Sequence, residues 1–167
     1  MERIRQILDP EYLSDLGTLP LDDLRAMRSR CSEFELTVSY DRRVVQARME
    51  ILEAEGERRA RGGSLDELVA DLPRILGAES GRASASSTRV ANAQSPSIEL
   101  HWPDGREALI GDSTLANLPA LSESELASTT ERLREFEREL SEVRHELHAV
   151  IDRLDREIAS RQVAGTP

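Results

Sequence analysis

Two stretches of this chain carry residues at alternating spacings of three and four, and this spacing constrains the fold more than any other feature. In the first stretch the spaced positions hold Leu24, Met27, Cys31, Phe34, Val38, Asp41, Val45, Arg48 and Leu52. In the second they hold Leu126, Thr129, Leu133, Phe136, Leu140, Val143, Leu147, Val150 and Leu154. Two charges interrupt the first seam and one threonine interrupts the second. Such heptads predict helices that bury a narrow seam.

The composition supports a narrow core. Aromatic residues make up 3% of the 167 residues and charged residues 32%, so there are too few bulky side chains to fill a wide interior. We therefore expect an all-α protein: a long antiparallel two-helix coiled-coil hairpin with short accessory helices and a poorly ordered middle segment. Two ordinary bundle helices are the alternative.

Turn and cap signals divide the chain into five segments. Pro20 precedes an acidic first turn, Gly62 and Gly63 end a long helical stretch, and capping boxes begin at Ser64 and Ser122. We expect an N-terminal lead-in helix at 1–19, the first coiled-coil helix at 20–61, a middle segment at 62–121, the second coiled-coil helix at 122–160 and a tail at 161–167.

The middle segment has three expected parts. The first is a short helix from Ser64 to about Leu76, and the second is a serine-rich flexible linker at 77–97. The third is a small β-hairpin, in which 98–102 alternates, 103–105 turns and 106–110 returns.

Charge and cysteine content narrow the partners and the compartment. The chain has 22 basic residues, all of them arginine, against 32 acidic residues, for a net charge of −10. This balance argues against direct nucleic-acid binding and favours a basic protein partner. Cys31 is a single cysteine and cannot form an internal disulfide, and no apolar run is long enough to cross a membrane. We expect a cytoplasmic protein without membrane contact.

The two helical stretches are copies of each other at an offset of 102 residues. Identical residues recur at Leu24/Leu126, Arg30/Arg132, Glu33/Glu135, Phe34/Phe136, Glu35/Glu137, Ser39/Ser141, Arg42/Arg144, Ala47/Ala149, Leu52/Leu154 and Glu55/Glu157. A polar set recurs within the copies: Glu35, Ser39, Arg42, Gln46 and Glu50 against Glu137, Ser141, Arg144, His148 and Asp152.

Each polar set forms a stripe beside the seam. Its spacing of i, i+4, i+7, i+11 and i+15 falls within an arc of about 80° on a helix. Coiled-coil stability requires no fixed polar order at these positions, so the repetition indicates a binding site. The alternative is a solvated face of intrahelical ion pairs.

The chemistry of the stripe suits a guanine nucleotide. Arg42 and Arg144 can fork onto guanine O6 and N7 or onto phosphate oxygens. A carboxylate such as Asp152 or Glu50 can accept hydrogen bonds from guanine N1 and N2. Two pseudo-symmetric copies suit a ligand that is itself two-fold symmetric.

The repeated pattern E-x3-S-x2-R-x3-Q/H-x3-E/D resembles that of the RsiG family of actinobacterial anti-sigma factors. The resemblance covers roughly 20–55 and 122–160, and the sequence departs from the family motif at Glu50 and His148. It implies that the ten stripe residues bind a dimer of cyclic di-GMP. It also implies that the bound form sequesters a WhiG-like sporulation sigma factor. With both copies in one chain, we expect a monomer that forms a heterodimer with the sigma factor.

Other chemistries have weaker support. His145, His148 and Asp152 have a spacing that could hold a metal, but His148 is already explained by the repeat, so we expect no metal. Cys31 occupies a seam position and is expected to be packing. The sequence contains no recognisable glycine-rich phosphate-binding loop or Ser-His-Asp arrangement, so we expect that the protein is not an enzyme. The rival class is a constitutive coiled-coil adaptor or structural protein without a nucleotide ligand.

Overall fold

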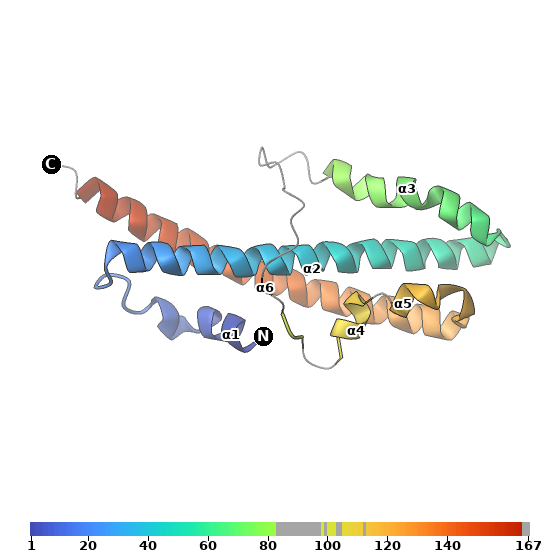
Figure 1. Ribbon diagram of the computed structural model, residues 1–167, viewed down its shortest axis with the longest axis horizontal. Coiled ribbons are helices and arrows are strands. Elements are labelled where there is room, and N and C mark those ends of the chain that lie inside the picture. Colours follow the sequence, from blue (N-terminus) through green and yellow to red (C-terminus); the bar gives the residue numbers. More distant parts are fainter. Residues whose placement is uncertain (83–97, 99, 103–104, 112, 165–167) are drawn as a thin grey trace. The chain divides into compact units, whose positions relative to one another are not determined.

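The computed structural model confirms the all-α hairpin (Figure 1). It describes residues 1–82, 98, 100–102, 105–111 and 113–164, and within these residues it contains helices and no strand. The chain separates into two compact units, and each is described by itself. Unit 1 comprises Met1–Asp41, Pro96–Asp104 and Glu139–Pro167, and unit 2 comprises Arg42–Ser95 and Gly105–Arg138.

The two long helices begin and end close to where their signals predict. Helix α2 spans Leu21–Arg61, directly after Pro20, and it ends where Gly62 takes a positive φ of 69° that favours glycine. Helix α6 spans Glu123–Ala164, four residues beyond the expected end. Its capping box is formed, because the Ser122 backbone N donates to Glu125 Oε2 at 2.8 Å and the Glu125 backbone N donates to Ser122 Oγ at 3.3 Å.

Ion pairs show that α2 and α6 run antiparallel in each unit. In unit 1, Arg28 of α2 pairs with Asp155 of α6 at 3.0 Å. Further along α2, Glu35 contacts His148 and Arg144, which come earlier on α6. In unit 2, Arg42 pairs with Glu137, and Glu53 pairs with Arg134 at 2.7 Å. Rising numbers on one helix therefore meet falling numbers on the other.

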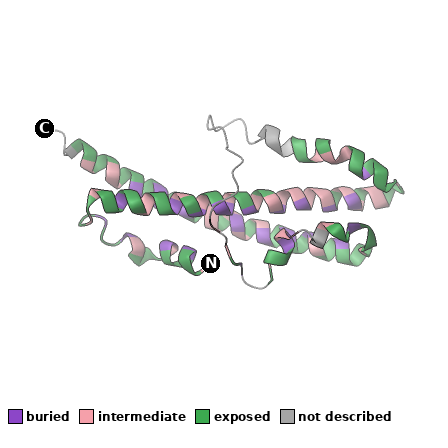
Figure 2. Ribbon diagram, viewed as in Figure 1, coloured by how far each residue is buried: buried purple, intermediate pink, exposed green. Residues whose placement is uncertain are grey.

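The predicted seam is the core. Of its eighteen positions all are buried except Met27, Thr129 and Val143, which are half-buried. The buried positions recur along both helices (Figure 2). Heptad spacing thus selects the residues that leave water, as expected for a coiled-coil seam.

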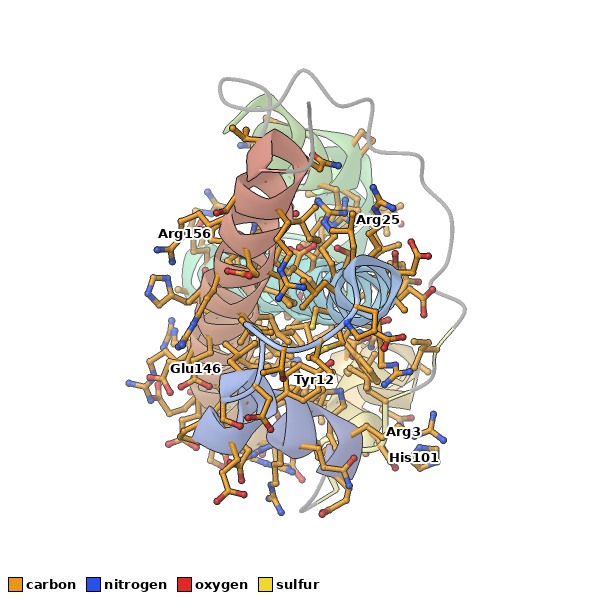
Figure 3. The ribbon with its side chains drawn as sticks, turned by 90° about the vertical axis from the view of Figure 1, so that its left-hand side faces the viewer. Arg3, Tyr12, Arg25, His101, Glu146 and Arg156 are labelled. Atoms are coloured by element: carbon orange, nitrogen blue, oxygen red, sulfur yellow. The ribbon has the colours of Figure 1, made fainter. Side chains whose placement is uncertain are left out.

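The N-terminal lead-in belongs to unit 1 and contributes to its core. Helix α1 (Glu2–Leu8) and the 3-10 helix η1 (Pro10–Leu13) bury Ile4, Ile7 and Leu13. Figure 3 shows Tyr12 between η1 and the long helices, whereas Glu146 and Arg156 of α6 point outward.

Arg161 fastens the lead-in to α6. Its guanidinium donates to the backbone carbonyl oxygens of Leu16 and Leu19, while Glu157 holds its Nε at 2.7 Å. The lead-in is therefore part of unit 1 and not a free extension.

In unit 2, Arg59 makes the contacts that Arg161 makes in unit 1, at the same offset of 102 residues. Arg59 donates to the carbonyl oxygens of Leu118 at 2.9 Å and Leu121 at 2.5 Å, and Glu55 holds its Nε at 2.5 Å. Hydrogen bonds from Arg58 and Arg59 hold the pKa of the fully buried Glu55 below its ordinary value. The internal repeat thus includes the segment before each long helix.

The remaining short helices also belong to unit 2. They are α4 (Glu107–Ile110), α5 (Ser113–Ala116), the 3-10 helix η3 (Leu118–Ala120) and α3 (Leu65–Arg82). The N-cap of α3 is made as predicted, since the Glu67 backbone N donates to Ser64 Oγ at 3.3 Å. This helix continues six residues past Leu76, so the expected linker begins later than predicted; residues 83–97 lie outside the described part of the chain.

The expected β-hairpin over 98–110 is wrong. Its returning strand is helix α4, and the described residues among 98–102 form no strand. Helix α4 buries Leu109, and the Arg106 guanidinium lies 5.8 Å from the centroid of the Phe136 ring on α6. An isolated hairpin has no sheet to pack against, whereas one helical turn gains these contacts. Residues 99, 103 and 104 lie outside the description.

The two charges that interrupt the first seam are buried and bonded to the middle segment. In unit 1, Trp102 Nε1 donates to Asp41 Oδ2 at 2.9 Å, and Trp102 is 4% exposed. In unit 2, Arg48 Nη1 donates to the Gly111 carbonyl oxygen at 2.6 Å. Each interruption is therefore an attachment point for residues between the two repeats.

We predict that Trp102→Phe lowers the free energy of unfolding by about 1–3 kcal/mol, because the buried Asp41 carboxylate loses its donor. Urea unfolding followed by circular dichroism measures the loss. In an Asp41→Leu background, which has no acceptor, the same replacement should cost much less. An equal cost in both backgrounds would show that the hydrogen bond is not the source.

Asp41 also predicts a pH dependence. Burial raises its pKa, and the Trp102 hydrogen bond offsets part of that rise. A raised pKa means that the folded state binds more protons, so the wild type loses stability as pH rises from the ordinary aspartate range through the folded pKa. Compared with Asp41→Asn, the wild type should be relatively less stable near pH 7 than near pH 4 in urea titrations. A difference that stays constant with pH would contradict this.

Candidate ligand-binding site

The polar stripes lie along the flanks of the seam on the two long helices. The residues Glu35, Ser39, Arg42, Gln46 and Glu50 are half-buried on α2. On α6, Glu137, Ser141 and Arg144 are half-buried, whereas His148 and Asp152 are exposed. The heptad register accounts for this placement, because a stripe beside a buried seam is partly covered by the facing helix.

Glu137 is the shared hydrogen-bond acceptor of one polar cluster within unit 2. Arg42 Nε and Gln46 Nε2 both donate to Glu137 Oε1, each at 3.0 Å. The two donors come from α2 and the acceptor from α6. The cluster therefore joins the first copy of the motif to the second, and it is not formed within a single copy.

Glu35 is the central carboxylate of the corresponding polar cluster within unit 1. Arg144 Nε donates to Glu35 Oε1 at 3.0 Å, and His148 Nε2 lies 3.2 Å from the same oxygen. Here the donors come from α6 and the acceptor from α2. The connectivity matches that of the Glu137 cluster with the helices exchanged.

This crossed pairing differs from the alternative of intrahelical ion pairs. In both motifs the glutamate binds the arginine of the facing helix, across 95 and 109 residues of sequence. Neither helix alone can form either cluster, so both require the antiparallel hairpin. Among the described residues, the Asp152 carboxylate takes part in neither cluster.

The arrangement fixes two arginine side chains for contact with an acceptor. An arginine whose Nε is bonded to a carboxylate keeps its guanidinium plane in one orientation, which suits bidentate recognition of phosphate or a guanine edge. The arginine side chains are 28% and 39% exposed, and both glutamate side chains are 20% exposed. The cations are thus the more accessible members of each pair.

Comparison with known protein families finds a match. The chain matches the RsiG-like family over residues 10–76 and 112–167, which contain both long helices and both clusters. The chain belongs to the RsiG-like family. A search of curated proteins finds no match.

Membership in the RsiG-like family implies an anti-sigma-factor type of role, with a sigma factor as the partner. Its proteins are regulatory, which agrees with the expectation that this chain is not an enzyme. None of the described helices of this RsiG-like protein is long and apolar enough to span a membrane.

The sequence of this RsiG-like chain also raised the questions of a reactive cysteine and of a metal site. Cys31 is fully buried in the seam, as expected, and burial raises the pKa of its thiol. Burial also raises the pKa of Tyr12 to about 12. Among the described residues, no group of histidine, cysteine and acidic side chains is arranged to hold a metal ion.

Sequence reasoning missed the contacts that attach the middle segment and the N-terminal lead-in to the long helices of this RsiG-like protein. Trp102 and Gly111 hold Asp41 and Arg48, and Arg59 and Arg161 bind backbone carbonyl oxygens. A signal was present, because charges inside a heptad seam need buried partners. The identity of those partners was not readable from spacing.

We predict that the crossed pairs are coupled in the absence of any ligand. A double-mutant cycle of Arg42→Ala and Glu137→Ala should give a coupling of about 0.5–1 kcal/mol in urea unfolding, because the pair is only partly exposed. The more exposed pair Arg134–Glu53 should give less. Coupling of Arg42 to Glu35 on its own helix, with none to Glu137, would contradict the crossed arrangement.

Proposed function

We propose that this RsiG-like protein is an anti-sigma factor whose ligand is cyclic di-GMP. The observation that carries the proposal is the crossed pairing, in which both motif copies make the same contacts with the helices exchanged. A repeated site of one chemistry suits a two-fold symmetric ligand. The resemblance to the RsiG motif, carried by Glu35–Glu50 and Glu137–Asp152, supports the same ligand.

The proposed contacts follow from the donors and acceptors of the stripe. Arg42 and Arg144 fork onto guanine edges or phosphate oxygens, which guanidinium groups recognise bidentately. Glu50 and Asp152 accept from guanine N1 and N2. The hydroxyls of Ser39 and Ser141 are small donors to phosphate or ribose, and Gln46 and His148 supply further donors. We expect two cyclic di-GMP molecules per chain.

The proposed partner is a WhiG-like sporulation sigma factor. A net charge of −10 gives the chain an acidic surface, and the promoter-reading surfaces of a sigma factor are basic because they bind DNA. We propose that a single chain, with cyclic di-GMP bound, captures the sigma factor as a heterodimer and represses its transcription programme. Occupation of those basic surfaces keeps the sigma factor from promoters.

Calorimetric titration of cyclic di-GMP tests the ligand. Arg42→Ala and Arg144→Ala should each weaken binding at least about tenfold, since each removes a charge-assisted bidentate contact. Arg134→Ala, which removes an interhelical arginine outside the motifs, is the matched control and should bind as the wild type does. Cyclic di-AMP controls for the guanine base.

Two results would contradict the proposal. If Arg42→Ala and Arg144→Ala bind with wild-type affinity, the stripe is not the site. If the wild type binds no nucleotide, the constitutive adaptor is the better description.

Sigma capture tests the mechanism. If cyclic di-GMP strengthens sigma binding, the sigma factor must strengthen cyclic di-GMP binding by the same factor. The Arg42→Ala, Arg144→Ala double variant should lose capture in the presence of cyclic di-GMP while circular dichroism shows it still helical. Undiminished capture by that variant without ligand would show that the nucleotide is not the switch.

A further inference from the structure

The two clusters share one connectivity but differ in one donor. Glu137 receives the amide of Gln46 at 3.0 Å, whereas Glu35 contacts the imidazole of His148 at 3.2 Å. A neutral imidazole with its proton on Nε2 donates as an amide does, so the geometry is alike.

The carboxylates are the inner members of both clusters. Glu35 and Glu137 are each 20% exposed, less than the arginines they hold. One oxygen, Oε1, accepts from both donors in the Glu137 cluster and is within reach of both in the Glu35 cluster. A group in this position orients the donors and does not itself face an anionic ligand, which its charge would repel.

We propose that Glu35 and Glu137 are positioning residues that act across the hairpin: each orients the arginine and the amide or imidazole donor of the other helix's motif for the nucleotide. This inference rests on the proposed binding of cyclic di-GMP. It concerns how that site is held.

The positioning role is tested by charge removal at constant size. In cyclic di-GMP calorimetry, Glu35→Gln and Glu137→Gln should each weaken binding about tenfold, because the fixed orientation of one arginine is lost. The matched control is Glu53→Gln, which disrupts the interhelical Arg134–Glu53 pair outside the motifs and should leave affinity within about twofold. Wild-type affinity in both motif variants would overturn the inference.

Rescue by the conservative variant is a readout that a merely structural role would not move. Glu35→Asp and Glu137→Asp keep the carboxylate on a shorter side chain, and each should recover part of the affinity that the glutamine variant loses. Equal loss with aspartate and with glutamine at both positions would overturn the positioning role.

Two outcomes separate the two levels of the claim. A wild type that binds no cyclic di-GMP overturns the proposed function itself. Binding that is lost in Arg42→Ala but kept in both glutamate variants overturns the positioning role alone.

Discussion

Burial of two matching apolar seams is the constraint on which the rest of the molecule depends. With 3% aromatic residues the chain cannot build a broad interior, so its core is the narrow contact between α2 and α6. A narrow seam covers only part of each helix surface. The flanks remain partly accessible, and the polar stripes are held there at fixed positions along rigid helices.

The accessory segments depend on the same seam through buried polar groups. Asp41 and Arg48 occupy seam positions where apolar residues are expected, and each is bonded to the middle segment. A buried charge without a partner is costly, so these positions favour structures in which Trp102 and Gly111 contact the long helices. The two charged residues therefore attach these parts of the middle segment at the expense of apolar area in the core.

The crossed glutamate–arginine pairing makes both polar clusters conditional on the folded hairpin. Glu35 meets Arg144 and Glu137 meets Arg42, so an isolated helix contains the motif but neither cluster. The arginine and carboxylate fastenings at Arg59 and Arg161 follow the same repeat. One duplicated sequence thus supplies the long helices, their lead-in attachments and both polar clusters, which explains why the clusters have one geometry.

The sequence by itself determined what depends on neighbouring turns of one helix. Heptad spacing identified the buried seam, capping boxes and Gly62 located helix ends within a few residues, and the offset of 102 identified the two stripes. These features were predictable because they arise from periodicity and local hydrogen bonds.

Tertiary structure alone decided which distant groups meet. The spacing of Glu35 and Arg42 allowed pairs within one helix, and the facing helix supplied the partners that formed. The alternation at 98–102 suggested a hairpin, but contacts of Leu109 and Arg106 with the unit 2 core favoured a helical turn in 107–110. Such choices depend on contacts between residues far apart in sequence, and their energies are comparable to local propensities, so packing overrides the local pattern.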